Sequence, residues 1–328
     1  MVTEINTILE KTIIKQVNCI LCNSIDQELI FKGIKDLEYE TYKPVDYLLC
    51  KNCGLISQYP LPEINLLQRF YPDEYRNYLP VKKSLFTSLK NTQFKNLANK
   101  ITKYFNKDIK NNDLKILEIG FGNGQLLLAL QEKGYTSLSG SDFTDRVFSS
   151  LKEKGIELKA SNIEERFPFN EVFDVIIMNN VIEHFLNPKK VLENCKSNLS
   201  KNGIIILITP NTDALELLFF KNYWAGFHAP RHTFLFNEKN IKLVGKDLGF
   251  TEVITEPICD PGQWSISIQN VFQNLSLTKS KLKNGMSFYL MPLSLLFTPI
   301  AIIQNFIGKS TSMLCVFKQE LSRISTAK

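Results

Sequence analysis

The middle of the chain alternates short apolar runs with amphipathic segments. Residues 114–134, LKILEIGFGNGQLLLALQEKG, predict a short buried strand, a glycine-rich turn and a helix that ends near Gly134. Further strands are predicted in TSLSGSDFT, before SNIEERFPF, and in the apolar runs of FDVIIMNN and GIIILITPN. Strands of continuous apolar residues that alternate with helices are typical of a parallel sheet covered on both faces. The pattern therefore predicts an α/β fold with a doubly wound sheet.

Two segments outside this region are also patterned. Residues 84–106 carry apolar side chains at helical spacing, which predicts a helix packed against the domain that follows. Residues 286–307 contain no charge and are long enough to span a bilayer, but Pro292 and Pro299 interrupt them. STSMLCVFKQ, just beyond, is predicted to be the last sheet strand and must return to the core. We therefore expect 286–307 to form an apolar hairpin that covers a substrate or lies at a membrane surface.

The composition is that of an ordered soluble enzyme with room for about two domains. The chain has 328 residues, of which 44% are hydrophobic. Its net charge of +6 arises from basic residues scattered among acidic ones, which argues against nucleic acid as a partner. The first residues, MVTEINTILEKTIIKQ, lack the apolar core of a secretion signal. We therefore expect a cytoplasmic protein.

Four of the seven cysteines form two CxxC pairs, Cys19 with Cys22 and Cys50 with Cys53. Two such pairs in a chain without a secretion signal are typical of structural zinc, which four thiolates enclose without leaving a position for catalysis. A redox pair, a disulfide or bound iron are the alternatives. The other cysteines lie among apolar neighbours and are expected to be buried: Cys195, Cys259 and Cys315.

The glycine-rich turn carries the first candidate chemistry. Gly120, Gly122 and Gly124 alternate, so backbone amides there can approach a ligand that a β-carbon would push away. A dinucleotide-binding turn needs its third glycine at position 125, where this chain has Gln125. Glu118, at the end of the strand, would repel a pyrophosphate but suits a ligand with an ammonium group. Together these features favour S-adenosylmethionine over a dinucleotide.

Asp142 ends the second strand, 24 positions after Glu118. In a doubly wound sheet, this is about where a carboxylate accepts hydrogen bonds from both ribose hydroxyls. A solvated loop aspartate is the alternative. Asn162 follows the third strand, from which its side chain could meet the edge of an adenine ring.

Residues 112–252 resemble a class I S-adenosylmethionine-dependent methyltransferase domain, with matches at Glu118–Gly124, Asp142, SNIEERFPF, NNVIEHFLNP and GIIILITPN. With the double CxxC and RHTFLFNEKNIKLVGKDLGF, the chain is similar to bacterial methyltransferases that have an N-terminal zinc module. Several of those act on nucleotide-linked sugars or surface-polysaccharide precursors. The resemblance implies a Rossmann-like, mostly parallel seven-stranded sheet.

The resemblance also implies a division of the chain into four parts. Residues 1–80 would form the zinc-binding module and a tyrosine-rich bridge, and 81–111 a linker helix. Residues 112–252 would form the S-adenosylmethionine-binding core. Residues 253–328 would form a C-terminal extension with the apolar hairpin and the final strand.

Cofactor-binding residues follow from the same resemblance. Glu118 and the glycine turn would hold the methionine end, Asp142 the ribose and Asn162 the adenine side. The family often has an aspartate where this chain has Asn162, but an amide both donates and accepts hydrogen bonds. The loop after the fourth strand would pass the sulfonium. The full set is Glu118, Gly120, Phe121, Gly122, Gly124, Asp142, Asn162, Asn179 and Asn180.

All three histidines of the chain follow strands of the predicted sheet. His184 comes after the fourth strand, whereas His228 and His232 lie in HAPRH, where Pro230 favours a loop over a helix. Because ligands bind at the carboxyl edge of such sheets, we expect the histidines to converge on one cleft. There one of them would take a proton from the methyl acceptor. We favour His232 and His184 over His228 as this base.

Other roles for these residues are open. Glu183 and His184 could cap a helix or orient the loop, and His228 could stack on a neighbouring aromatic ring. A metal site that uses both histidines of HAPRH would need a third ligand, such as Glu183 or Asp213.

Three further side chains are candidates for contacts with ligands. Arg231 could clamp a phosphate or carboxylate of the acceptor, or could be a surface residue. Tyr75 and Tyr78 could cover the cofactor, or could only pack.

The predicted function is transfer of a methyl group from S-adenosylmethionine to a small acceptor, most simply a nucleotide- or lipid-linked sugar. The alternatives are an inactive methyltransferase-fold binding module and an NAD-dependent oxidoreductase. Lysines on both sides of 286–307 would meet anionic headgroups, so the prediction includes peripheral contact with the inner face of a membrane.

Overall fold

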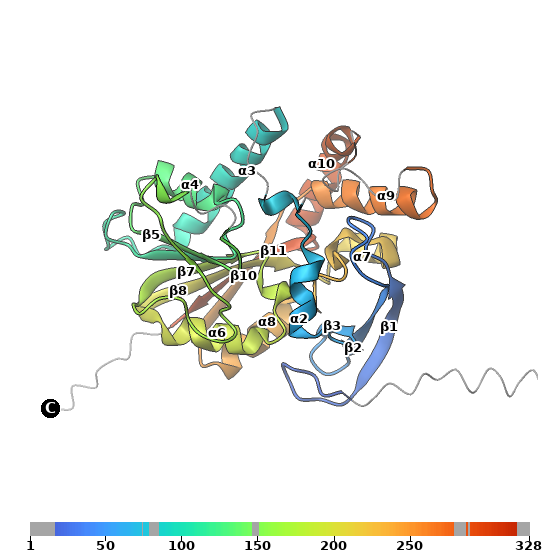
Figure 1. The fold of residues 1–328 in the computed structure, drawn as a ribbon, viewed down its shortest axis with the longest axis horizontal. Coiled ribbons are helices and arrows are strands. Elements are labelled where there is room, and N and C mark those ends of the chain that lie inside the picture. The colour runs from blue at the N-terminus through green and yellow to red at the C-terminus, as the bar shows by residue number, and fades with distance from the viewer. Residues whose placement is uncertain are drawn as a thin grey trace, which may run out of the picture.

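The computed structural model of the chain describes residues 17–73, 75–78, 85–145, 151–278, 287 and 289–319, which form two sheets surrounded by helices (Figure 1). The larger sheet has seven strands in the order β10-β11-β8-β7-β4-β5-β6. All its pairings from β8 to β6 are parallel, whereas β11 is antiparallel to both neighbours. The predicted mostly parallel, seven-stranded fold is confirmed. The strands are β4 (Ile116–Ile119), β5 (Leu138–Asp142), β6 (Glu157–Ala160), β7 (Phe173–Asn179), β8 (Leu199–Pro210), β10 (Glu252–Ile258) and β11 (Ser312–Lys318).

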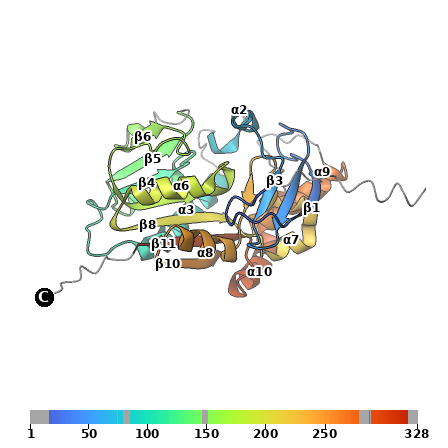
Figure 2. The same ribbon diagram turned by 90° about the horizontal axis from the view of Figure 1, so that it is seen from below.

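Alternate residues of these strands fill two cores, because successive side chains point to opposite faces of a sheet. Ile116 and Val175 pack in one core with α3 and α4, whereas Leu117 and Ile176 pack in the other with α6 and α8. Figure 1 shows α3 and α4 above the sheet and α6 and α8 below it, and Figure 2 shows the lower pair in front. These helices are α3 (Leu85–Ile101), which continues as the 3-10 helix η3 (Thr102–Tyr104), α4 (Gln125–Glu132), α6 (Pro188–Ser197) and α8 (Glu238–Asp247).

The strand order reverses beside β4. From β4 the chain moves outward through β5 and β6, then returns to β7 on the other side of β4 and continues through β8. At such a reversal the connections leave in opposite directions, and a crevice opens at the carboxyl ends of the strands. The candidate cofactor residues of the sequence lie at this edge.

The smaller sheet combines two distant parts of the chain. Strands β1 (Gln27–Ile34), β2 (Val45–Cys50) and β3 (Ile56–Tyr59) form an antiparallel meander, and β9 (Phe234–Leu235) pairs with β3. HAPRH directly precedes β9 and is a loop, as predicted. The smaller sheet therefore fixes one end of this loop.

Short helices connect the two sheets. Three of them carry the chain from β3 toward α3, and three others lead from β8 to HAPRH. In chain order they are α2 (Ile64–Leu67), η1 (Gln68–Phe70), η2 (Arg76–Tyr78), α7 (Leu215–Phe220), η5 (Lys221–Tyr223) and η6 (Ala225–Phe227).

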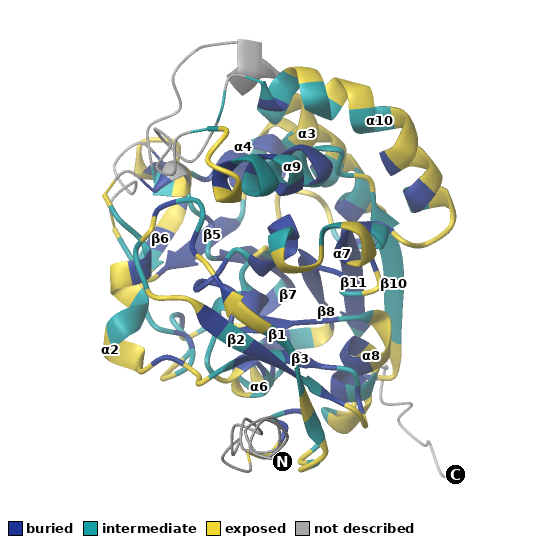
Figure 3. Cartoon of the chain, turned by 90° about the vertical axis from the view of Figure 1, so that its right-hand side faces the viewer, coloured by how far each residue is buried: buried dark blue, intermediate teal, exposed yellow. Residues whose placement is uncertain are grey.

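Helices α9 (Gly262–Asn274) and α10 (Leu290–Phe306) lie between β10 and β11 and pack against each other. The expected hairpin is wrong, because 290–306 form one helix with Pro299 inside it. Stacking of Trp264 on Phe297 holds α10 against α9. Within the described residues, no helix is long and apolar enough to cross a membrane. Much of α10 is exposed (Figure 3), including Leu295, Leu296, Ile302, Ile303 and Phe306.

A buried ion pair ties HAPRH to the smaller sheet. Arg231 Nη2 lies 2.9 Å from Oδ1 of Asp36, in the loop after β1, and both side chains are 1% exposed. Burial opposes ionisation of Asp36, but the guanidinium and hydrogen bonds from Thr41 lower the pKa of its carboxyl overall. Arg231 also donates a hydrogen bond to the carbonyl of Phe70. The path of the HAPRH loop therefore depends on this pair.

Replacement of Asp36 by alanine is expected to lower the free energy of unfolding by about 3–5 kcal/mol, because it removes the closer partner of the buried Arg231 charge and leaves Glu38 at 3.5 Å. The measurement is urea denaturation followed by circular dichroism. The matched control is Glu252→Ala, which breaks the exposed Glu252–Lys318 ion pair and is expected to cost less than about 1 kcal/mol. The double variant Asp36→Leu/Arg231→Met should recover most of the loss. An equal loss of stability in Asp36→Ala and Glu252→Ala would contradict a stabilising role for the buried ion pair.

Candidate active site

A cavity of about 1350 Å³ opens at the carboxyl ends of β4, β5 and β7. The loop after β1, the segment 64–78, HAPRH and the start of α9 complete its wall. A pocket for one drug-sized molecule measures about 300–1,000 Å³, so this cavity has room for a cofactor and a second molecule. Eight of the nine candidate cofactor residues line it, as do all three histidines. The exception is Gly124, which begins α4.

The glycine turn is shaped by close packing. Gly120 has φ +68°, and a β-carbon there would lie 2.4 Å from the side chain of Val181. Gly124 has φ +73° and caps the start of α4, and a β-carbon there would lie 2.4 Å from the side chain of Leu151. The amide of Gly122 donates a hydrogen bond to Oδ2 of Asp142 at 3.1 Å. The turn and the second strand therefore form one rigid cradle.

Two buried carboxyl groups face this cradle. Oε2 of Glu118 has no hydrogen-bond partner in the described part of the chain, although the residue is 2% exposed. Burial, reinforced by the charge of Asp142, raises the pKa of Glu118 well above its usual range. Burial also raises the pKa of Asp142 to about 6, against the opposing effect of the Gly122 amide. A cationic or hydrogen-bonding ligand would satisfy both groups, and S-adenosylmethionine carries an ammonium and two ribose hydroxyls.

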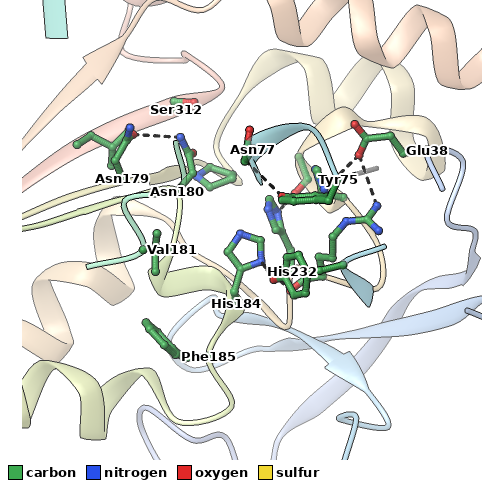
Figure 4. A pocket seen from close by; sticks show the side chains of 18 of the residues that line it. Glu38, Tyr75, Asn77, Asn179, Asn180, Val181, His184, Phe185, His232 and Ser312 are labelled. Atoms are coloured by element: carbon green, nitrogen blue, oxygen red, sulfur yellow. Dashed lines mark hydrogen bonds and ion pairs between the residues drawn. The ribbon is translucent and has the colours of Figure 1, made fainter. Parts of the chain in front are cut away.

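The candidate asparagines are placed differently from one another. Asn162 bonds with its own turn: its Nδ2 donates to Glu165 at 3.1 Å and its Oδ1 accepts from the amide of Glu164. Asn179 ends β7 and accepts a hydrogen bond from Asn180, which has φ +54° (Figure 4). All three line the cavity.

The histidines meet at the other end of the cavity. His184 belongs to the 3-10 helix η4 (Ile182–His184), and its ring centroid lies 4.7 Å from that of His232 (Figure 4). His228 stacks on His232, with ring centroids 5.0 Å apart. Nδ1 of His232 lies 2.8 Å from the carbonyl of Gly226, and Nδ1 of His184 lies 3.0 Å from that of Arg231.

Burial weakens two of these histidines as bases. It lowers the pKa of His184 to about 4 and that of His232 well below 6.5. Burial also raises the pKa of Glu183, which bonds to Thr209, to about 8. His228 differs, because its side chain is 20% exposed and its Nε2 lies 3.1 Å from Oε2 of Glu38.

Arg231 has neither of the roles expected for it. Its side chain is buried rather than at the surface, and its guanidinium is held by Asp36, so it is not available to clamp an acceptor. The sequence around Arg231 contains no pattern from which its pairing with Asp36, 195 positions earlier, could be predicted. The metal site expected from both histidines of HAPRH is not formed among the described residues, because His184 and His232 group with Glu183, without His228 or Asp213.

The tyrosines of the bridge lie over the cavity. Tyr78 donates a hydrogen bond to Oδ1 of Asp142 at 3.4 Å, and Tyr71 bonds to Nδ1 of His184 at 3.0 Å. Tyr75 packs edge-on against Tyr71 and contacts the ring of His228. The bridge therefore touches both ends of the cavity.

The four paired cysteines come together at the edge of the smaller sheet. Sγ of Cys19 lies 3.6 Å from that of Cys53, and Sγ of Cys22 lies 3.5 Å from that of Cys50. All four sulfurs lie within 4.8 Å of one another. A tetrahedral ion with bonds of about 2.3 Å needs sulfurs about 3.8 Å apart, so the arrangement fits zinc. Of the remaining cysteines, Cys259 is exposed rather than buried as expected.

Comparison with known families decides the assignment of the fold. The family described as "Methyltransferase domain" matches residues 89–256, just over half of the chain. The chain belongs to this methyltransferase family.

Individual relatives match more narrowly. A "Ubiquinone biosynthesis O-methyltransferase" of Rickettsia canadensis is 31% identical over 120 residues, which cover 35% of this chain and 49% of the relative. A second protein named "Ubiquinone biosynthesis O-methyltransferase", from Parvibaculum lavamentivorans, is 31% identical over 104 residues, which cover 30% of this chain and 41% of the relative. The methyltransferase chain thus spans about half the length of these relatives. A solved SAM-dependent methyltransferase from Archaeoglobus fulgidus has a TM-score of 0.46 and 17% identity, covering 70% of this chain and 94% of that one.

Sequence reasoning missed three residues of the methyltransferase site. Tyr71 contacts His184, Glu38 contacts His228, and Asp36 holds Arg231. The several tyrosines of the bridge after the zinc module could have indicated that Tyr71 also lies at the site. The two acids follow β1 in the predicted zinc module, where no pattern connects them with HAPRH.

The pKa of Asp142 predicts how this methyltransferase binds S-adenosylhomocysteine. Below pH 6 the carboxyl gains a proton and loses its capacity to accept two ribose hydrogen bonds. Affinity measured by calorimetry should therefore be about tenfold weaker at pH 5 than at pH 7. Asp142→Asn should bind weakly at both pH values. A variant that keeps the wild-type pH dependence would show that another group is responsible.

Proposed function

We propose that this protein transfers the methyl group of S-adenosylmethionine to the oxygen of a small hydroxyl-bearing acceptor. The observation that carries the proposal is the placement of two buried acids, Glu118 and Asp142, on one cavity beside the glycine turn. When bound, S-adenosylmethionine supplies a methyl group already activated on a sulfonium. The protein then has to hold the two molecules in line and accept a proton.

The same acids argue against an NAD-dependent oxidoreductase. Glu118 would face the pyrophosphate of a dinucleotide at close range. Position 125, which would need a glycine, is Gln125, a buried residue of α4 that bonds to Asn91. An inactive binding module is disfavoured because the glycine turn, both acids and the histidines all line one cavity.

We assign the proton transfer to His228. Its partner Glu38 can stabilise the imidazolium that forms, as the acid of a catalytic triad does. The low pKa values of His184 and His232 make them weaker proton acceptors near neutral pH. With the methyl donor held by the glycine turn, Glu118 and Asp142, His228 would accept the proton of the acceptor hydroxyl as the oxygen takes the methyl group, and sulfur would keep the electron pair of its broken bond to carbon.

The class of acceptor has two candidates. A nucleotide- or lipid-linked sugar is the prediction from the sequence, and the size of the cavity and its polar histidine end support it. The relatives named for ubiquinone biosynthesis support a hydroxylated aromatic ring instead. Both carry a hydroxyl group, so the chemistry assigned to His228 is the same.

Two further parts of the prediction belong to this proposal. The four cysteines would hold one structural zinc ion, which the spacing of their sulfurs supports. The exposed apolar side of α10 would allow peripheral contact with a membrane and access to a lipid-linked acceptor.

Transfer of a radiolabelled methyl group to a panel of nucleotide sugars and hydroxylated aromatics tests the function. We expect His228→Asn to reduce kcat by about 10²–10⁴-fold, because general-base catalysis contributes that much. Its affinity for S-adenosylhomocysteine should stay at the wild-type value. Binding of the cofactor without transfer to any acceptor in the panel would favour the binding module, and failure to bind it would refute the proposal itself.

Elemental analysis is expected to show that Cys53→Ser contains one zinc per chain fewer than the wild-type protein, because the cysteine cluster holds that ion. Because β9 belongs to the smaller sheet, hydrogen exchange in this variant should accelerate in β1 to β3 and also in residues 231–235. The amides of β4, β7 and β8 should remain protected and serve as the internal control. Unchanged protection of the smaller sheet would contradict a structural role for the metal.

A further inference from the structure

We propose that Glu183, His184 and His232 bind a divalent transition-metal ion at the acceptor end of the cavity. One donor atom from each of these side chains lies within 4.8 Å of the other two. The site is open on one side, because both histidines line the cavity. The role of the ion in the reaction rests on the proposed function, whereas the binding of the ion does not.

The two segments that supply the ligands are joined directly. Glu183 and His184 belong to η4, whereas His232 belongs to the HAPRH loop. The amide and the hydroxyl of Thr233 both donate hydrogen bonds to the carbonyl of Glu183, at 2.8 and 3.0 Å. The ligands are therefore held in place by the fold before any ion arrives.

Both histidine rings are oriented as metal ligands are. Each Nδ1 contacts a backbone carbonyl, that of Arg231 for His184 and that of Gly226 for His232. Since a carbonyl only accepts, each Nδ1 carries the proton, and Nε2 of the neutral ring keeps a lone pair. At His184 the hydroxyl oxygen of Tyr71, 3.0 Å from Nδ1, is then a second acceptor of the same proton. Metal-bound histidines typically give their other N–H to a carbonyl or carboxylate in this way.

The carboxyl group of Glu183 completes the set. Its Oε2 accepts a hydrogen bond from Thr209, whereas its fully buried Oε1 has no such partner among the described residues. Oε1 lies 3.8 Å from Nε2 of His232, too far for a hydrogen bond. Two ligands on a tetrahedral ion with bonds of about 2.1 Å lie about 3.4 Å apart. A small shift would therefore let one ion bind both atoms.

The surrounding charges are compatible with a cation. The positive charge of Arg231 acts on both histidines, but Asp36 and Glu38 both pair with it. Glu183 has no pairing with a lysine or arginine among the described ion pairs, so an ion would replace the proton of its carboxyl group and compensate the charge of the buried carboxylate. An ion with open positions would bind the acceptor oxygen and lower its pKa, which makes proton transfer to His228 easier.

Co²⁺ titration into protein whose cysteine cluster is loaded with zinc tests the site. We expect one Co²⁺ per chain in addition to the retained zinc, without the intense near-ultraviolet absorption of a thiolate-bound ion. Glu183→Gln, which keeps the bond to Thr209, should weaken Co²⁺ binding at least tenfold. Thr209→Val, which removes only the partner of the ligand, should weaken it about 10–100-fold.

The matched control is Glu216→Gln, which alters a different buried carboxyl group, bonded to Gln304 and Thr311. It should leave Co²⁺ affinity unchanged. Thermal melting identifies any variant that fails to fold, and calorimetry with S-adenosylhomocysteine tests the cofactor site in the same samples. No added Co²⁺, Co²⁺ bound through thiolates, or equal affinity in Glu183→Gln would overturn the metal site. Any of these results with intact cofactor binding would leave the proposed function standing.

Discussion

The buried ion pair between Arg231 and Asp36 fixes the position of the HAPRH loop, and the geometry of the histidines depends on it. Removal of two charges from water is costly, so such a pair persists only where its partners match closely. The backbone of the loop is held as well, because Tyr47 of β2 donates a hydrogen bond to the carbonyl of His232. The loop is thus held from the smaller sheet, although its chemistry faces the larger one.

The cavity consequently has two halves of different origin. The parallel sheet supplies the end with Glu118, Asp142 and the glycine turn, where strand order reverses. The smaller sheet and the HAPRH loop supply the end with the histidines. The tyrosine bridge spans both halves, since Tyr78 contacts Asp142 and Tyr71 contacts His184. Cofactor and acceptor would therefore be held by separate parts of one fold.

Sequence reasoning succeeded where chemistry follows strand direction. Glu118 and Asp142 end adjacent parallel strands, so their meeting at one edge could be predicted from apolar runs alone. Contacts between distant loops have no such pattern, which is why Asp36 and Glu38 were missed. The proposed order of the histidines as bases differs from the predicted one, because burial lowers the pKa values of His184 and His232 and cannot be seen in a sequence. The hairpin expected near Pro299 failed because packing on α9 keeps α10 helical.

Strand β9 has only two residues, Phe234 and Leu235, which pair with Ser57 and Ile56. This short pairing joins the HAPRH loop directly to the meander of β1 to β3, whose Leu55 also packs in one core with Leu117 of the larger sheet. Substitutions in β1 to β3 could then tilt the histidines and retune which molecules are accepted. Acceptor choice in related proteins could therefore diverge through substitutions before residue 60, far in the sequence from the histidines that they would move.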